Sequence, residues 1–113
     1  VMAEGMESPA LSEIFEKVAL QEMEHLEEFA DRIKYLGGVP TTKPNPIKVG
    51  GTLKEMIEDD LELEYHAIKL YKGQIAIAKE IGDTTTRLML EKILTAEEEH
   101  ADKWETVLKK RVK

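Results

Sequence analysis

Two copies of the pattern Glu-x-x-His constrain this chain more than any other feature of its sequence. Glu22 precedes His25 by three residues, and Glu97 precedes His100 by the same spacing. Residues three apart lie on one face of an α-helix, so each pair aims a carboxylate and an imidazole at the same region. The chain has only three histidines, and two of them stand in these pairs. The pattern therefore predicts helices that carry side chains suited to binding metal.

Apolar residues at helical spacing surround both pairs, and a third stripe of the same kind carries Glu64 near its middle. The three stripes are Leu11, Phe15, Val18, Glu22, His25, Phe29 and Leu36; Leu53, Ile57, Leu61, Glu64, Ile68, Tyr71, Ile75 and Ala78; and Leu90, Ile93, Glu97, His100, Trp104 and Val107. A buried carboxylate is costly unless it is paired or coordinated. Mixed carboxylate and imidazole ligands suit divalent iron, manganese or zinc. We therefore expect Glu22, His25, Glu64, Glu97 and His100 to form a metal site.

Two plainer interpretations of these residues need no metal. A solvated helix face would explain the charges, but the stripes place both pairs inward. A buried salt-bridge network would need cations, and lysine and arginine are absent from the inward positions around the motifs. Elsewhere, His66, Glu98 and Glu99 are expected at the surface. Tyr71 and Trp104 are expected to pack in the core near the site.

Length and composition exclude several classes of protein. The 113 residues predict a single domain over residues 1–113, and the absence of cysteine removes disulfides, zinc fingers and iron–sulfur clusters. A net charge of −7 disfavours nucleic acid and anionic membranes as partners and attracts cations. No apolar run approaches the ~18 residues of a membrane span, and no signal peptide is visible. These features together predict a cytoplasmic, all-α protein.

The first helix is expected from about Pro9 to Leu36, with Ser8 as its cap. Gly37 and Gly38 then end it. Residues 38–51 are rich in proline and glycine and predict an extended connection. Such a connection could span ~45 Å, the length of the helix, and start the second helix parallel to the first. One long crossover of this kind is typical of ferritin-like bundles.

The second and third helices are expected over about residues 52–81 and 84–111. Thr52 followed by Glu55 predicts a capping box at the start of the second helix. Thr84 or Thr85 is expected to cap the third helix, which would end in the basic run Lys109-Lys110-Arg111. The short turn between them predicts an antiparallel hairpin.

These motifs resemble the ferritin-like di-iron carboxylate family, and in detail bacterioferritin, over about residues 8–108. The segments that carry the resemblance are Glu22-Met23-Glu24-His25, Ala30-Asp31-Arg32-Ile33 and Leu36-Gly37-Gly38-Val39-Pro40; Met56 with Asp60-Leu61-Glu62-Leu63-Glu64; and Ile93-Leu94, Glu97-Glu98-Glu99-His100 and Trp104-Glu105-Thr106. The order of the motifs and the lengths between them agree with the family.

The resemblance implies a function and a role for each ligand. Glu22 and Glu97 would bridge two irons, His25 would bind one iron, and Glu64 and His100 would bind the other. The family binds Fe(II), oxidises it with O2 or peroxide, and in cage-forming members stores the ferric product. Met23 falls where bacterioferritin places a methionine that ligates haem between two subunits, so haem is an additional cofactor to consider.

The chain departs from the family in one respect: the family has four helices, and the first supplies a further glutamate. We expect a homo-oligomer, or a complex with a chain that supplies this helix to an N-terminally incomplete domain. Two other functions stay open at this point. One is a rubrerythrin-like peroxidase or oxygen scavenger, and the other is a non-catalytic helical-bundle fragment with a partial metal site.

Overall fold

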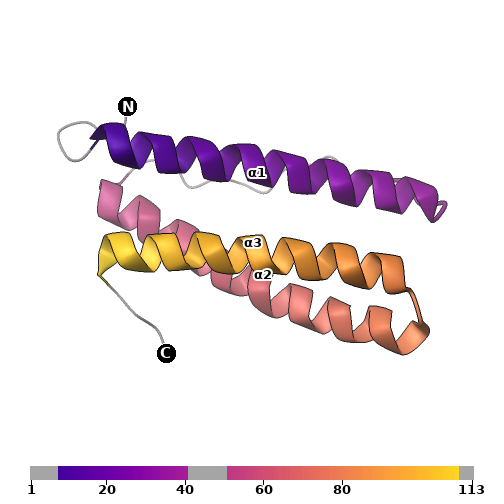
Figure 1. Ribbon diagram of the computed structural model, residues 1–113. Coiled ribbons are helices and arrows are strands. Elements are labelled where there is room, and N and C mark those ends of the chain that lie inside the picture. The colour runs from indigo at the N-terminus through magenta and orange to yellow at the C-terminus, as the bar shows by residue number, and fades with distance from the viewer. Residues whose placement is uncertain (1–7, 41–50, 110–113) are drawn as a thin grey trace. The chain divides into compact units, whose positions relative to one another are not determined.

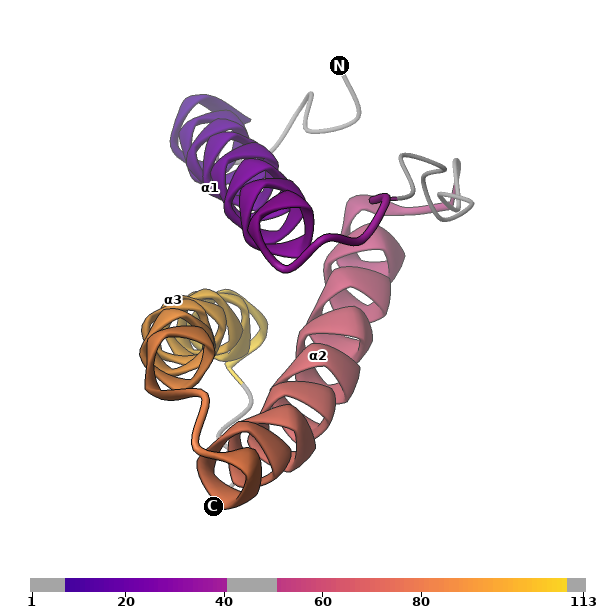
Figure 2. The same cartoon turned by 90° about the vertical axis from the view of Figure 1, so that its right-hand side faces the viewer.

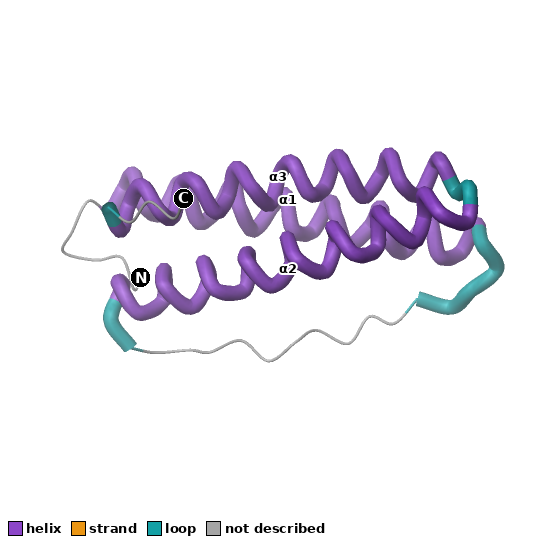
Figure 3. The backbone as a smooth tube through the Cα atoms, turned by 90° about the horizontal axis from the view of Figure 1, so that it is seen from below, coloured by secondary structure: helices purple, strands orange, loops and turns teal. Residues whose placement is uncertain are grey.

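The structure is a computed structural model that describes residues 8–40 and 51–109. All the regular structure in these residues is helical: α1 (Ser8–Tyr35), α2 (Leu53–Ile81) and α3 (Thr84–Leu108), as Figures 1 and 3 show. The all-α prediction is therefore confirmed. None of these helices is long and apolar enough to cross a membrane. The chain divides into two compact units, Val1–Ile47 and Lys48–Lys113, and each is described by itself below. The expected crossover falls largely on residues 41–50, outside the described ranges.

Helix α1 ends one residue earlier than expected, at Tyr35. Gly37 follows with φ +88°, a left-handed conformation that glycine adopts without steric cost. The backbone N–H of Gly38 donates to the Ile33 carbonyl at 2.9 Å and satisfies one of the last carbonyls of the helix. Leu36 lies beyond this end and is 58% exposed, so its expected place in the buried stripe is wrong.

The start of α2 follows the predicted capping box. The Thr52 hydroxyl accepts from the Glu55 backbone N–H at 3.1 Å, and the Glu55 carboxylate accepts from the Thr52 N–H at 3.0 Å. The same backbone hydrogen bond lowers the pKa of Glu55. At the other end, Gly82 has φ +79° and its N–H bonds the carbonyls of Ala78 and Lys79. Local sequence therefore fixes both ends of this helix.

The residue that caps α3 is Asp83, not Thr84 or Thr85 as expected. Its carboxylate accepts from the Thr86 backbone N–H at 3.1 Å and from the Thr86 hydroxyl at 2.5 Å. Aspartate is at least as good a cap as threonine, and its negative charge also suits the positive end of the helix dipole.

The end of α3 also differs from the prediction. The helix stops at Leu108, and Lys109 takes a left-handed conformation with φ 57°. The Lys109 N–H closes the helix by bonding the carbonyls of Glu105 and Thr106. The last turn therefore contains no basic residue, and Lys109, the first residue of the basic run, is the C-cap of the helix. Lys110 and Arg111 lie outside the described residues.

The second unit is the predicted antiparallel hairpin of α2 and α3 (Figure 1). Seen from the side of the turn, the two helices meet at residues 82–83 and are inclined to one another (Figure 2). Its buried apolar side chains come from both helices: Leu53, Ile57, Leu61 and Ala78 from α2, and Leu90, Ile93, Ala101 and Trp104 from α3. All but Ala101 stand in the predicted stripes, so the hairpin core follows the sequence pattern closely.

Candidate metal centre

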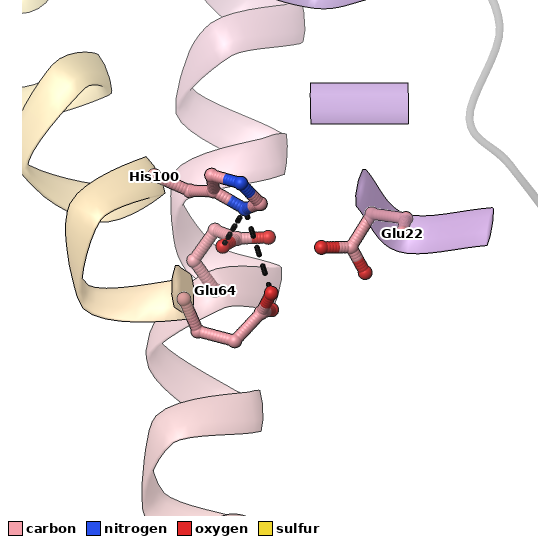
Figure 4. A group of neighbouring side chains, drawn as sticks. Glu22, Glu64 and His100 are labelled. Atoms are coloured by element: carbon pink, nitrogen blue, oxygen red, sulfur yellow. Dashed lines mark hydrogen bonds and ion pairs between the residues drawn. The ribbon is translucent and has the colours of Figure 1, made fainter. Parts of the chain in front are cut away.

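Three of the expected ligands meet within the hairpin: Glu64 of α2, and Glu97 and His100 of α3. The His100 Nδ1 atom lies 3.2 Å from Glu64 Oε2 and 3.4 Å from Glu97 Oε1. Each residue offers a ligand atom, and these atoms lie within 4.8 Å of one another. Figure 4 shows the His100 ring turned toward the Glu64 carboxylate. We call these three residues the hairpin ligand group.

Burial makes this group unusual among charged residues. Glu64 is 5% exposed, and Glu97 and His100 are each 1% exposed. Two carboxylates buried beside one imidazole are costly to ionise, because water cannot screen their negative charge there. A divalent cation would compensate that charge, and its preferred donors include carboxylate oxygen and imidazole nitrogen. The chemistry of the donor set therefore fits a divalent metal.

Helical spacing explains why these side chains meet. Glu97 and His100 are three residues apart and share the face of α3 that also carries Ile93 and Trp104. Glu64 occupies the matching position on α2, between the buried Leu61 and the half-buried Ile68. Because the hairpin turn is short and both helices are capped, the middles of the two helices come to one level.

Two further polar contacts join α2 to α3 beside the ligand group, and sequence analysis missed both. The Trp104 indole Nε1–H donates to Asp60 Oδ2 at 2.5 Å, and the Tyr65 hydroxyl donates to Glu105 Oε2 at 2.5 Å. Burial, and then the hydrogen bond and charge of Glu105, raise the pKa of Tyr65 to about 12. Spacing offered one signal: Asp60 stands four residues before Glu64, and Trp104 four residues after His100.

The other Glu-x-x-His pair lies on α1. His25 Nδ1 is 3.9 Å from Glu22 Oε1, so the two side chains project from the same side of the helix. Met23, the residue considered for haem, is 60% exposed on α1. Both residues of this pair belong to the first unit.

The residues expected at the surface of the hairpin are there. His66, Glu98 and Glu99 are all exposed, as their offsets from the stripes predicted. Tyr71 is half-buried. Trp104 is fully buried, as expected for a core residue, but its indole N–H also makes a hydrogen bond that the core interpretation did not anticipate.

Known proteins resemble this chain over most of its length. The family model described as Ferritin-like domain matches residues 1–112. Bacterioferritin of Mycobacterium bovis is 42% identical over 91 residues, which are 80% of this chain and 57% of that protein. Bacterioferritin of Desulfovibrio desulfuricans is 36% identical over 80% of this chain and 51% of its own length. The chain thus spans little more than half the length of these curated relatives.

Solved structures show the same likeness. Bacterioferritin BfrA of Mycobacterium tuberculosis superposes with a TM-score of 0.78 at 40% identity, over 82% of this chain and 59% of that one. A structure described as ferritin like, diiron-carboxylate proteins from Bacillus anthracis superposes with a TM-score of 0.88 at 30% identity, over 93% of this chain and 76% of that one. The chain therefore belongs to the ferritin-like family, close to bacterioferritin, and its helices are those of a ferritin-like bundle.

Proposed function

We propose that this chain forms one ferritin-like domain that binds two iron ions and oxidises Fe(II) with O2 or peroxide, in iron storage or detoxification. The observation that carries the proposal is the hairpin ligand group: two carboxylates and one imidazole, all nine-tenths buried or more, with ligand atoms within 4.8 Å of one another. Membership of a family whose solved members include a di-iron carboxylate protein supports iron as the metal.

In this proposal the two Glu-x-x-His pairs contribute to one centre. Glu22 and Glu97 would be shared by both ions, His25 would bind the first, and Glu64 and His100 would bind the second. Bound iron supplies the electron that the oxidant takes. The protein's own contribution is to place the carboxylates and imidazole rings around the ions, which bind the ionised form of a carboxylate and the neutral form of an imidazole. The buried surroundings of Glu97 and His100 also keep bulk water from competing for the ion.

Surface charge and assembly are also part of the proposed function. A net charge of −7 attracts Fe(II) to the protein surface before it reaches the site. We propose that the domain works in the cytoplasm as a homo-oligomer, or together with a chain that supplies a further carboxylate to the ion on the His25 side. The similarity of this chain to bacterioferritin supports this proposal.

The test is the number of metal ions per chain after anaerobic Fe(II) loading, measured by elemental analysis of desalted protein. Two ions per chain, followed by O2 or peroxide consumption in proportion to the iron added, is the expected result. One ion per chain would restrict the centre to the hairpin ligand group. Protein that retains no iron would overturn the proposal and leave a ferritin-like scaffold without the chemistry.

A further inference from the structure

Two polar contacts between α2 and α3, one buried and one part-buried, share a single register. Asp60 pairs with Trp104, and Glu64 pairs with His100. On α2 the second pair lies four residues after the first, and on α3 it lies four residues before it. Because the helices are antiparallel, the two contacts lie next to each other along the interface, one helical turn apart. The Asp60–Trp104 contact therefore sits directly beside the hairpin ligand group.

Besides the hairpin ligand group and the Asp60–Trp104 and Tyr65–Glu105 hydrogen bonds, the buried side chains of the hairpin are apolar. Burial of residues such as Leu61, Leu90 and Ile93 stabilises the pairing, but the hydrophobic effect has no direction and tolerates small slides. A slide by one residue moves a helix by about 1.5 Å. That displacement is about half of the 3.2 Å between His100 Nδ1 and Glu64 Oε2, enough to break the contact. Apolar packing alone would thus leave the ligand group loosely placed.

The contact between Asp60 and Trp104 has the direction that the apolar contacts lack. An indole ring has a single N–H, which lies in the ring plane and can donate in one direction only. Trp104 has no exposed surface, so an indole N–H without its acceptor would carry the cost of lost hydration. Its carboxylate partner on α2 fixes one point of α3 against one point of α2.

We propose that Asp60 and Trp104 are positioning residues whose hydrogen bond holds α3 at the register in which the His100 imidazole faces the Glu64 carboxylate. They do not touch the metal in this scheme and act only through the placement of His100. The effect on metal affinity rests on the proposed function, whereas the effect on the His100 ring can be seen in metal-free protein.

The experiment compares Asp60→Leu, Asp60→Asn and Trp104→Phe with the parent protein. Asp60→Leu removes the acceptor, Trp104→Phe removes the donor but keeps an aromatic ring, and Asp60→Asn keeps an acceptor oxygen without the charge. Asp59→Leu is the matched control, since it makes the same chemical change one residue away, on another side of α2. Circular dichroism establishes that each variant is helical.

The first measurement is the ¹H–¹⁵N correlation spectrum of the histidine rings in metal-free protein at neutral pH. We expect Asp60→Leu and Trp104→Phe to move or broaden the His100 Nδ1 signal. In Asp60→Asn the signal should stay close to its parent position. The second measurement is Co²⁺ affinity by calorimetry. We expect a loss of about tenfold in the first two variants, the size typical of changes beside a metal site, and near-parent affinity in Asp60→Asn and Asp59→Leu.

A His100 signal that stays at its parent position in both Asp60→Leu and Trp104→Phe would overturn the inference, whatever the variants do to thermal stability. An equal change in Asp59→Leu would also overturn it, because the effect would then not depend on the hydrogen bond. A parent protein that binds no Co²⁺, with a His100 signal that responds as expected, would contradict the proposed function and support the positioning role.

Discussion

The two Glu-x-x-His pairs have the same spacing but differ in geometry. In α3 the His100 and Glu97 atoms approach to 3.4 Å, and the Glu97 side chain is 2% exposed. In α1 the equivalent atoms of His25 and Glu22 are 3.9 Å apart, and the Glu22 side chain is 42% exposed. Within the second unit, α2 brings Glu64 to the α3 pair. There the motif supplies two candidate ligands, and the neighbouring helix adds a third.

The largest expected effect tests whether the more deeply buried pair is the stronger metal site. Glu97→Gln keeps the shape of the side chain but removes its charge, so we expect a loss of about a hundredfold in Co²⁺ or Fe(II) affinity. The matched control is Glu98→Gln, because Glu98 is the adjacent residue and is exposed. Calorimetric titration measures both. Equal affinities in the two variants would contradict a role for the hairpin ligand group in binding.

A second prediction tests whether the α1 pair joins that site. His25→Ala should lower iron from two ions to one per chain, since the hairpin ligand group stays intact. His66→Ala is the control, because His66 is exposed and outside the proposed centre. Elemental analysis after anaerobic loading gives the numbers. Two ions retained by His25→Ala would show that α1 does not supply a ligand through this residue.

A third prediction concerns the turn that brings α2 and α3 together. Asp83→Ala removes the side chain that accepts from Thr86 N–H and Thr86 hydroxyl, so we expect a loss of about 1 kcal/mol in the free energy of unfolding. Thr84→Ala, at a position that sequence alone suggested as the cap, should change it by less than about 0.5 kcal/mol. Urea unfolding of both variants decides between them, and a larger effect of Thr84→Ala would restore the sequence-based assignment.

The smallest expected effect appears at alkaline pH, and again concerns a contact between α2 and α3. The pKa of Tyr65 is raised to about 12 from the ordinary 10.0. The folded protein therefore keeps this proton more tightly than the unfolded chain does. The resulting stabilisation is fully present below pH 10 and is lost as the pH rises through 12.

Unfolding experiments between pH 9 and pH 12 test this sign. Parent protein should lose stability over that range more steeply than Tyr65→Phe, which has no phenol to titrate. Tyr35→Phe is the control, since Tyr35 is 78% exposed. Identical slopes for parent and Tyr65→Phe would contradict the hydrogen bond to Glu105.

Sequence reasoning predicted the hairpin well because its signals are local or periodic. Thr52 and Glu55 form a capping box by spacing alone, and the stripes of α2 and α3 identify nearly all the buried apolar residues. Sequence reasoning failed where two neighbouring residues could each cap the same helix. Asp83 and Thr84 are both good caps, and the backbone geometry of the turn selects the aspartate.

In the candidate site, too, sequence reasoning predicted what depends on periodicity and missed what depends on the contact between helices. Periodicity placed Glu64, Glu97 and His100 inward, because a helix repeats along its length. It could not identify Asp60 as the partner of Trp104, since that contact depends on the register between two helices, and apolar stripes do not specify a register. Whether Glu22 and His25 reach the same centre depends likewise on the placement of one unit against the other, which no local pattern encodes.

The short turn at residues 82–83 has a consequence for the order of folding. Glu64 and His100 are separated by a segment that is almost entirely helical, so their meeting needs little loop-closure entropy. Local contacts of this kind form early, within the microsecond to millisecond range of small helical proteins. We therefore expect the hairpin ligand group to form early in folding. If the group binds metal as proposed, an ion captured at that stage would act as a template for the other proposed ligands.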